Sequence, residues 1–591
     1  MFPTFIFNVL KMYKDKHPAV LYFFYSCPLP GQFAIQTCFR GRFGEEIASD
    51  EFGAQIMLFA KQPHQHWSTG HIEYTEVRHA GQAFRLGRYP IHFHLNGNVS
   101  GNYVRGCSIH HTFNRAITIH AVHNLLVEHN VVFNVMGHAF FLEDGIETKN
   151  ILQYNLAVFV RPSSSLLNTD ISPAAFWIRN PDNYVRHNAA VGGTHAGFWY
   201  NAPPNPGGPS YDPEICPRFV PLLEFRNNTC HSHGRFGLWI YPFYMPHTIG
   251  SCSHPGPVIP AEFYGLTAWR VEKGVEGVEL GNVRFIEFLI SDATKSAVEI
   301  QQVNDHPGGP MLKDSVLIGW SEISDGTKKC TETGLQLPQS KNYTVDGVTF
   351  INFDKSRCSA LRACAYCKNS QGGFQTRFRN ITFVNSPSRT NWQWQHEAWF
   401  EDLDGSLTGQ GAGYSVLPYN PNLPKDHCTF NNPEYGTDSV PGAICDDTVK
   451  FHRFAFNEIS PTSLEHKACF FINEHGMSRV EFQRERLTHT SGWMVTLVDA
   501  SSYNMVFERT SYITNIHYVG QVEDVYYGEY VILGHNFTQI IDGLSVYGHI
   551  KWVFPSSKNP MSFEGSRYGD WYNKNNKATR FSYISKYSMQ F

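Results

Sequence analysis

Two short segments alternate along the chain at a nearly constant spacing, and this repeat limits the fold more than any other feature. The first segment reads apolar, two residues, Asn or an equivalent, one residue, apolar; the second is a small residue followed by apolar ones. The offset from the central residue of the first to the small residue of the second is nine in five of six pairs, and twenty in the remaining one. The pairs are Cys107/Ala116, Asn130/Ala139, Asn155/Ala175, Asn188/Gly197, Asn228/Gly237 and Phe288/Ala297.

A fixed offset with spacers of variable length indicates a repeated cross-section from which loops leave at one corner. The shortest period is 23 residues, from Cys107 to Asn130. This is too short for repeats of helix pairs, and the segments are rich in β-branched and aromatic residues. We therefore predict an all-β fold, a parallel β-helix whose coils stack about 4.8 Å apart. The Asn residues would stack as a ladder that satisfies the backbone groups of a tight turn.

The repeat divides the chain into three predicted parts. Residues 1–34 form an uncertain leader, which we interpret as a truncated or mis-predicted start because Lys and Pro break its apolar stretches. Residues 35–447 form the parallel β-helix with long loop insertions that carry disulfides. From residue 448 short alternating segments continue without the Asn pattern, so 448–591 is a C-terminal β-rich region.

Composition narrows the class of protein and its compartment. The formal net charge is −4 and 17% of the residues are charged, which excludes a basic nucleic-acid binder and a disordered chain. No apolar run is long enough to predict a membrane span. The 13 cysteines predict disulfides and an oxidising compartment, with Cys107 as the unpaired thiol of the odd count. Five glycosylation sequons point the same way, at Asn98, Asn227, Asn342, Asn380 and Asn536.

Strand alternation predicts which residues of the second segment face outward. One outward column of aromatic rings reads Phe141, Trp177, Trp199 and Trp239. We expect these four rings to align on one face and to bind a ligand, because sugar rings pack on aromatic faces. The alternative is that insertions such as 201–221 cover this face and that the rings form a second small core.

The next outward column supplies the candidate catalytic residues. It reads His120, Glu143, Arg179, Asn201 and Tyr241, and Asp144 lies beside Glu143. If the chain is an enzyme, His120, Glu143, Asp144 and Arg179 would be its catalytic group. Cleavage of a polysaccharide requires convergent carboxylates, or a carboxylate with a positioned cation. The alternative is a surface ladder of alternating charges.

The metal-binding patterns are incomplete, so we predict no metal and no cofactor. His92 and His94 form an H-x-H pair that points to one face of a strand, but no carboxylate or third histidine is found at a matched spacing. The C-x-x-C at residues 364–367 lacks a second pair. Residues 401–409 resemble half of a calcium loop without its downstream Glu, so calcium is a weak alternative to an Asp-stabilised turn.

Four short patterns carry a resemblance to known families: R-Y-P-x-H-F-H from Arg88, S-I-H-H-T-F from Ser108, E-D-G from Glu143 and D-x-D-G-S from Asp402. The longer segments 87–131, 137–160, 174–181, 192–200 and 402–409 make the chain resemble the fibrocystin-L family over roughly residues 35 to 580. The four short patterns are those that it shares with a more distant family, the cell-migration-inducing hyaluronan-binding protein and its transmembrane hyaluronidase relative.

The resemblance implies a right-handed parallel β-helix with PbH1-type coils, located outside the cell in a large cell-surface glycoprotein. Fibrocystin-L has no established enzymatic activity, whereas the more distant relatives depolymerise hyaluronan. Our first hypothesis is therefore a non-enzymatic adhesion, coat or glycan-binding module. Its partner would be an extracellular glycan or a cell-surface protein, and not nucleic acid. The alternatives are a hyaluronan-depolymerising glycosidase and a structural spacer.

Overall fold

The computed structural model describes most of the chain from residue 51 to residue 508. The described residues are 51–62, 68–163, 168–303, 309–322, 329–338, 340, 342–363, 372–437, 439–460, 462–484, 491–499 and 501–508, together with short strands at 25–26, 37–38, 517–523, 532–534, 540–541, 544–551 and 579–584. Apart from β1 (Tyr25–Ser26), the predicted leader 1–34 lies outside the described residues. The chain forms two compact units, Met1–Ile300 with Pro310–Glu332 and Gln301–Gly309 with Thr333–Phe591.

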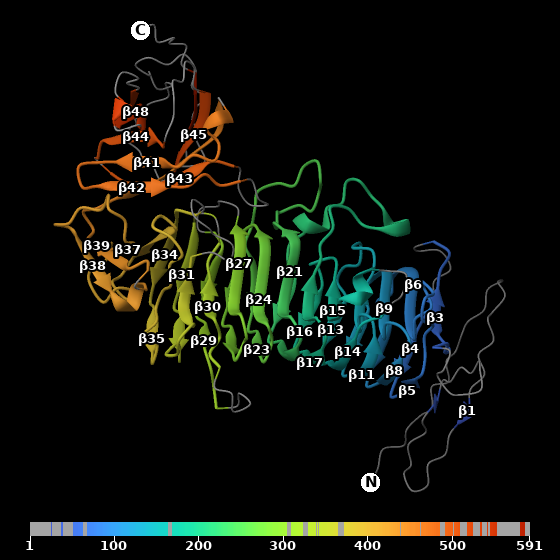
Figure 1. Cartoon of the computed structure of the whole chain (residues 1–591). Coiled ribbons are helices and arrows are strands. Elements are labelled where there is room, and N and C mark those ends of the chain that lie inside the picture. The colour runs from blue at the N-terminus through green and yellow to red at the C-terminus, as the bar shows by residue number, and fades with distance from the viewer. Residues whose placement is uncertain are drawn as a thin grey trace. The chain divides into compact units, whose positions relative to one another are not determined.

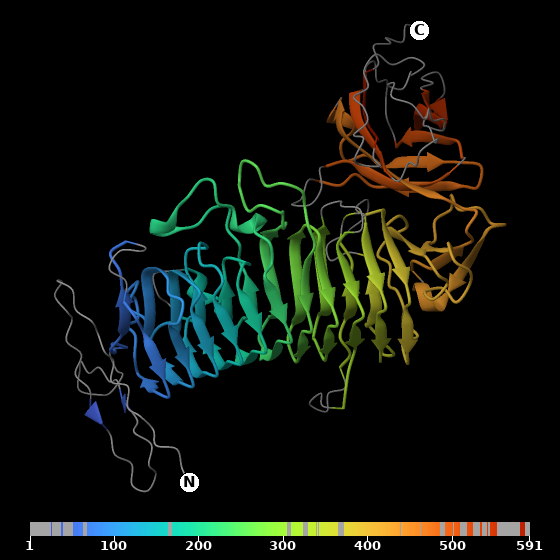
Figure 2. The ribbon, with the colours of Figure 1, turned by 180° about the vertical axis from the view of Figure 1, so that it is seen from behind.

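The first unit is a stack of coils, and each coil contributes one strand to each of three sheets (Figures 1 and 2). Nine described strands of this unit belong to each sheet. The first sheet contains, in spatial order, β4 (His71–Glu73), β7 (Tyr103–Arg105), β10 (Leu126–Glu128), β13 (Ile151–Gln153), β16 (Tyr184–Arg186), β19 (Glu224–Arg226), β22 (Ala261–Tyr264), β25 (Val283–Ile286) and β28 (Met311–Lys313).

The second and third sheets follow the same order of coils. The second contains β5 (Glu76–Arg78), β8 (Ser108–Thr112), β11 (Val131–Met136), β14 (Leu156–Arg161), β17 (Ala189–Gly193), β20 (Thr229–His233), β23 (Thr267–Trp269), β26 (Leu289–Ser291) and β29 (Val316–Ile318). The third contains β3 (Ile56–Phe59), β6 (Ile91–Asn98), β9 (Ile117–His123), β12 (Phe140–Leu142), β15 (Ala174–Ile178), β18 (Ala196–Tyr200), β21 (Phe236–Tyr244), β24 (Lys273–Leu280) and β27 (Ser296–Val303). Neighbouring coils pair in parallel, as in Val127↔Val104 and Phe140↔Ile117, so the predicted parallel β-helix is confirmed.

The second unit begins with further parallel pairs and then changes to antiparallel sheets. Parallel pairs join β30 (Thr333–Gln336) to β33 (Ser359–Arg362), β31 (Tyr343–Asp346) to β34 (Phe374–Arg379), β32 (Thr349–Ile351) to β35 (Thr382–Val384), and β34 to β36 (Ala398–Asp402). The antiparallel strands are β37 (Ser415–Pro418), β38 (Cys428–Asn432), β39 (Gly442–Cys445), β40 (Phe451–Ser460), β41 (Cys469–Ile472), β42 (Met477–Val480), β43 (Trp493–Val498), β44 (Tyr503–Phe507), β45 (His517–Glu523), β46 (Ile532–Gly534), β47 (Ile540–Ile541), β48 (Leu544–Lys551) and β49 (Thr579–Ile584). The predicted domain boundaries at 34/35 and 447/448 stay predictions.

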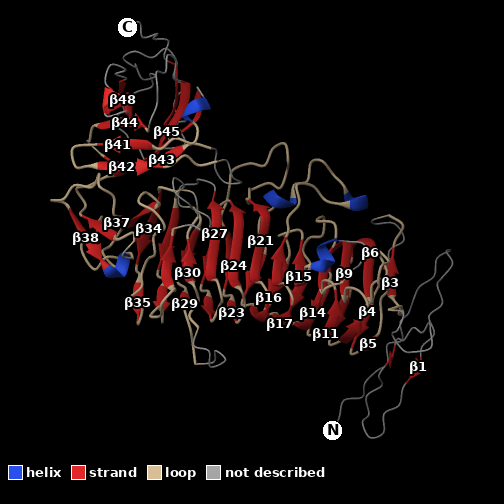
Figure 3. Ribbon diagram, in the orientation of Figure 1, coloured by secondary structure: helices blue, strands red, loops and turns tan. Residues whose placement is uncertain are grey.

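Helical structure in the described residues is limited to short 3-10 turns, which Figure 3 shows in blue. They are η1 (Asn168–Ile171), η2 (Gly208–Ser210), η3 (Pro217–Phe219), η4 (Pro433–Tyr435) and η5 (Thr462–Leu464). Strands β1 and β2 (Thr37–Cys38) form a separate antiparallel pair. None of the helices in the described part of the chain has the length and apolar character needed to cross a membrane.

The predicted Asn ladder is present at the turn between the first and second sheets. The Nδ2 atoms of Asn130, Asn155 and Asn188 donate to the Oδ1 atom of the next Asn, at 2.9, 3.0 and 3.2 Å, and Asn228 ends the series. The backbone N–H of Cys107 donates to Asn130 Oδ1 at 3.0 Å. Amino acids far apart in sequence are therefore vertical neighbours.

A second ladder, which the repeat did not reveal, lies at the turn that precedes the first sheet. Asn150 Nδ2 donates to Asn183 Oδ1 at 3.0 Å, and the backbone N–H of Leu125 donates to Asn150 Oδ1 at 2.9 Å. Two corners of these coils are thus closed by buried amides whose donors and acceptors are satisfied by the next coil.

Disulfides hold the predicted loops, but more thiols are free than expected. Cys216 is bonded to Cys252 and Cys428 to Cys445. Cys107 is free and buried, as predicted; the expectation that it is the one unpaired thiol is wrong, because Cys230 and Cys469 are also free and buried. These two residues occupy apolar strand positions, where a thiol packs as a small hydrophobic group.

The sequons differ in their access to solvent. Asn98, Asn227 and Asn380 are exposed and Asn342 is half-buried. Asn536 lies outside the described residues. Glycosylation at these asparagines stays a prediction.

Candidate functional site

The predicted column of aromatic rings exists in the third sheet, but it is buried. The register pairs Phe141 with Trp177, Trp177 with Trp199 and Trp199 with Trp239. The exposed fractions of Phe141, Trp177 and Trp199 are 3%, 1% and 5%. At these positions the structure has the alternative, a second small core, and not an open row, because the rings pack together with Phe236 and small residues into a core cluster on the outer side of the sheet.

The neighbouring column keeps access to solvent. Glu143, Arg179 and Asn201 are half-buried, and the Tyr241 side chain is 41% exposed. The Tyr241 ring stacks on the half-buried ring of Trp239, with a centroid distance of 4.8 Å and an interplanar angle of 13°. We call Glu143, Arg179, Asn201 and Tyr241 the outer row.

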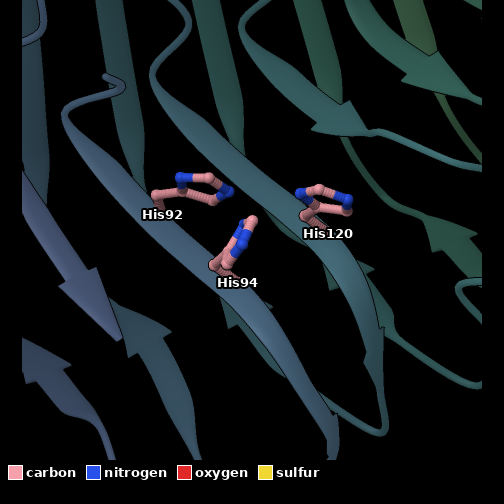
Figure 4. Close-up of side chains that lie close together, drawn as sticks. All are labelled: His92, His94 and His120. Atoms are coloured by element: carbon pink, nitrogen blue, oxygen red, sulfur yellow. The ribbon is translucent and has the colours of Figure 1, made fainter. Parts of the chain in front are cut away.

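At one end of the outer row, three histidines from two neighbouring strands meet. His92 and His94 alternate along β6 and therefore point to the same side of the sheet. The register of β6 and β9 places His120 beside His94. Figure 4 shows the three imidazoles turned toward one another, and one potential ligand atom from each lies within 4.8 Å of the others.

The hydrogen bonds of two rings determine which nitrogen faces the cluster. His92 Nδ1 lies 3.0 Å from the carbonyl oxygen of Gly87, and His120 Nε2 lies 2.9 Å from Asp144 Oδ2. Because a carbonyl or carboxylate oxygen can only accept, these nitrogens carry the proton and donate. The opposite nitrogen of His92, Nε2, is then free to offer a lone pair, as is Nδ1 of His120 once that ring is neutral.

Four buried atoms of this cluster that could act as metal ligands have no hydrogen-bond partner: His92 Nε2, His94 Nδ1, His120 Nδ1 and Glu143 Oε2. Glu143 Oε2 lies 4.0 Å from His92 Nε2 and 3.5 Å from His120 Nδ1. Glu143 Oε2 thus lies beside two of the three imidazoles. The expectation that no third histidine or carboxylate joins the H-x-H pair is wrong.

The environment sets the protonation of the imidazoles in two directions. Burial, followed by the neighbouring imidazoles, holds the pKa of His92 well below its usual range. Burial and then His120 lower the pKa of His94 to about 4. Burial also acts against a charged His120, but the hydrogen bond to Asp144 and the charge of Glu143 outweigh it and raise the pKa of His120. His92 and His94 are therefore neutral near pH 7 and can act as ligands.

Two buried residues orient the Glu143 carboxylate. The Tyr89 hydroxyl donates to Glu143 Oε1 at 3.3 Å. The same hydroxyl accepts from Arg115 Nη1 at 3.0 Å, and Arg115 forms a two-contact pair with Asp170 at 3.1 and 3.0 Å. Since Oε1 is engaged by Tyr89, Oε2 is the oxygen that faces the histidines.

A further buried carboxylate, Glu147, fixes the turn that follows β12. Its Oε1 accepts the backbone N–H of Ala121 and of Asp144, each at 2.9 Å, and its Oε2 accepts that of Gly145 at 2.7 Å. Sequence reasoning missed Glu147. The signal was a Glu close after the E-D-G pattern, at a position where backbone N–H groups need an acceptor.

Of the predicted catalytic set, the structure brings His120, Asp144 and Glu143 together. Arg179 makes no described contact with them. Burial lowers the pKa of Arg179, and the charges of Glu147, Asp144 and Glu143 oppose this. Farther along the third sheet, Lys273 forms a second buried polar group. Lys273 Nζ donates to Glu276 Oε1 at 2.5 Å and to Glu299 Oε1 at 2.8 Å.

The carboxylates of the half calcium loop are used within the turn. Asp402 Oδ1 accepts the N–H of Gly405 at 2.9 Å, and Oδ2 accepts the N–H and the hydroxyl of Thr408, each at 2.7 Å. Asp404 accepts the backbone N–H of Asn380 at 2.7 Å. This is the arrangement of an Asp-stabilised turn.

Part of the parallel β-helix matches a known family model. Residues 51–238 match the family model described as "CEMIP beta-helix". This range contains all of His92, His94, His120 and Glu143.

Over nearly its whole length the chain is similar to a portion of fibrocystin-L. It is 45% identical to fibrocystin-L of Mus musculus over 95% of this chain and 13% of that protein, and 44% identical to the Homo sapiens protein over 94% and 13%. It is 36% identical to the "Cell surface hyaluronidase CEMIP2" of Homo sapiens over 34% of this chain and 17% of the relative. The predicted resemblance is confirmed, and the chain spans about one eighth of the length of its fibrocystin-L relatives.

Proposed function

We propose that this chain is an extracellular module of a cell-surface protein and that it binds an acidic glycan along the outer row. The observation that carries the proposal is that Glu143, Arg179, Asn201 and Tyr241 keep access to solvent, whereas the neighbouring column is buried. The disulfides and the sequons support an oxidising, extracellular location.

The chemistry of the outer row suits a chain of sugars. Tyr241 offers an exposed ring whose orientation is held by Trp239, so a sugar can pack on it at little entropic cost. Arg179 can pair with the carboxylate of a uronic acid, and Asn201 can bond hydroxyl groups. Successive coils lie about 4.8 Å apart, close to the length of one sugar unit. Relatives named as hyaluronidases make hyaluronan the first glycan to test.

Binding of hyaluronan oligosaccharides to the immobilised chain tests this proposal. Tyr241→Ala should weaken binding by about tenfold, since an aromatic platform contributes about 1 kcal/mol or more. Tyr154→Ala is the matched control, because Tyr154 is similarly exposed at 47% but lies at a different corner. Equal binding by the parent chain, Tyr241→Ala and Arg179→Gln would refute the outer row as the binding surface.

A second candidate function, cleavage of the glycan, is favoured by one observation. Glu143 and the His120–Asp144 pair lie at the end of the outer row, so a carboxylate and an imidazole would meet a bound sugar there. Shortening of high-molecular-weight hyaluronan, abolished by Glu143→Gln or Asp144→Asn, would establish an enzyme. Binding without shortening would support the non-enzymatic module. If the chain neither binds nor shortens hyaluronan, the structural spacer is supported.

A further inference from the structure

We propose that His92, His94, His120 and Glu143 bind a zinc ion that ties three successive coils of the β-helix together. His92 and His94 come from β6, His120 from β9, and Glu143 from the turn after β12. Nothing in this inference depends on the binding of a glycan.

The polar atoms of this cluster are buried without hydrogen-bond partners, which is costly. A buried polar group that loses its hydrogen bonds to water must regain them in the protein or bind an ion. Here four such atoms are grouped, and the residues that carry His92 Nε2 and His120 Nδ1 are 0% and 7% exposed. A cation placed between these atoms would give each of them a partner.

In three of these side chains, the other polar atom is held by a hydrogen bond within the protein. Histidines that bind metals donate their other ring N–H to a carbonyl or a carboxylate, which fixes the tautomer and the ring orientation. His92 donates to the Gly87 carbonyl and His120 to Asp144. The Tyr89 hydroxyl holds the remaining oxygen of Glu143. These contacts present the metal-binding atoms before any metal is bound.

The distances fit a small ion after a modest adjustment. The three histidine ligand atoms lie within 4.8 Å of one another. A point central to them is therefore at most about 2.8 Å from each, and shifts of under about 1 Å give the Zn–N distance of about 2.0–2.1 Å. Three imidazoles and one carboxylate complete a tetrahedral set, which favours zinc over calcium because calcium requires six or more oxygen ligands.

Competition against a chromogenic zinc chelator tests the site on the purified chain after its metals have been removed. We expect about one equivalent of tight zinc binding. His94→Gln should lose about a hundredfold in affinity, because one of four ligands is gone. His129→Gln is the matched control, since His129 is an exposed histidine on another sheet edge, and it should bind like the parent chain. Cobalt should give the intense visible bands of a tetrahedral complex.

Thermal unfolding with and without zinc is a second measurement of zinc binding, and with a second variant it can still decide the question if one variant folds poorly. Zinc should raise the melting temperature of the parent chain and of His129→Gln, but not that of His94→Gln. Glu143→Gln is the second variant, as its half-buried side chain is replaced by one of the same shape, and it should lose at least about tenfold in affinity. Zinc binding that is weaker than millimolar in the parent chain, or unchanged in both His94→Gln and Glu143→Gln, would overturn the proposal.

Discussion

Two groups of buried polar side chains lie on the same outer face of the third sheet, and only one of them is built around a lysine. At β24 and β27, the Lys273 ammonium lies between the carboxylates of Glu276 and Glu299. In the column that runs from His92 through Trp239 to Glu276, the histidine end instead presents lone pairs. The same face thus buries charge in two ways.

The difference shows how an internal charge balance can be told from a binding site. Lysine brings a positive charge that stays with the chain, so a cluster built around it is complete once the chain folds. Burial acts against this charge, yet Glu299 and Glu276 together raise the pKa of Lys273. His92 and His94 are neutral imidazoles that supply no charge, so the lone pairs that they present beside Glu143 can be completed by a cation from outside.

Replacement of Lys273, which supplies the cation of the group with Glu276 and Glu299, has the largest expected effect on stability. Lys273→Met leaves Glu276 and Glu299 buried without a cation, and we expect a loss of about 3–5 kcal/mol in the free energy of unfolding. Urea unfolding measures it. Lys295→Met is the control, because Lys295 is 56% exposed in its pair with Glu272 and should change stability by less than about 1 kcal/mol. Similar losses in both variants would contradict the distinction.

A buried carboxylate in the second unit, that of Glu397, should make the stability of the protein depend on pH. Burial raises the pKa of Glu397 from 4.5 to about 8, although the Gln393 N–H and the Arg362 charge oppose this. The folded protein then retains a proton that the unfolded chain releases, so the stabilisation is complete below pH 4.5 and is lost as pH rises toward 8. The expected slope is about 1.4 kcal/mol per pH unit.

The variant Glu397→Gln removes this titration and should flatten the pH dependence. Between pH 5 and pH 7 the parent chain should lose about 2.7 kcal/mol more stability than the variant. Unfolding in urea at a series of pH values measures the difference. Parallel curves for the two proteins would mean that Glu397 is ionised when buried.

The contact behind His120 gives the smallest of these effects. Asp144→Ala removes the acceptor that fixes the His120 tautomer, and zinc affinity should fall about ten- to a hundredfold. Asp144→Asn should lose less, because its amide oxygen still accepts from His120 Nε2. Equal affinities for the parent chain and Asp144→Ala would show that this hydrogen bond does not organise the ligand.

The repeat predicted the coil stack because its signal is local to each turn. The Asn of each turn serves backbone groups of the adjacent coil, so the sequence repeats wherever the geometry does. The repeat did not align the coil that holds His92 and His94 with the others, because Pro90 stands where other coils have Ala or Gly. Aligned on Ile91↔Ile117, the sequence would have placed His94 beside His120.

Burial of the aromatic column could not be read from alternation. Alternation states only which side of a strand a ring occupies, and the outer side of this sheet is covered by groups from distant parts of the chain. Arg115 lies 3.6 Å from the centre of the Phe141 ring, and the His138 ring lies 4.3 Å from that of Trp177. Such cover depends on loop conformation, for which the sequence holds no repeating signal.

The Asn ladder has a direction. Each amide from Asn130 to Asn188 donates to the Oδ1 atom of the next asparagine and also to a backbone carbonyl of the preceding coil, so the bonds between the asparagine side chains all run in one direction, and such chains of hydrogen bonds polarise one another. The position of a residue in this series therefore decides its tolerance to change: loss of the Asn155 amide interrupts polarisation on both sides, whereas loss of the terminal Asn228 affects a single neighbour.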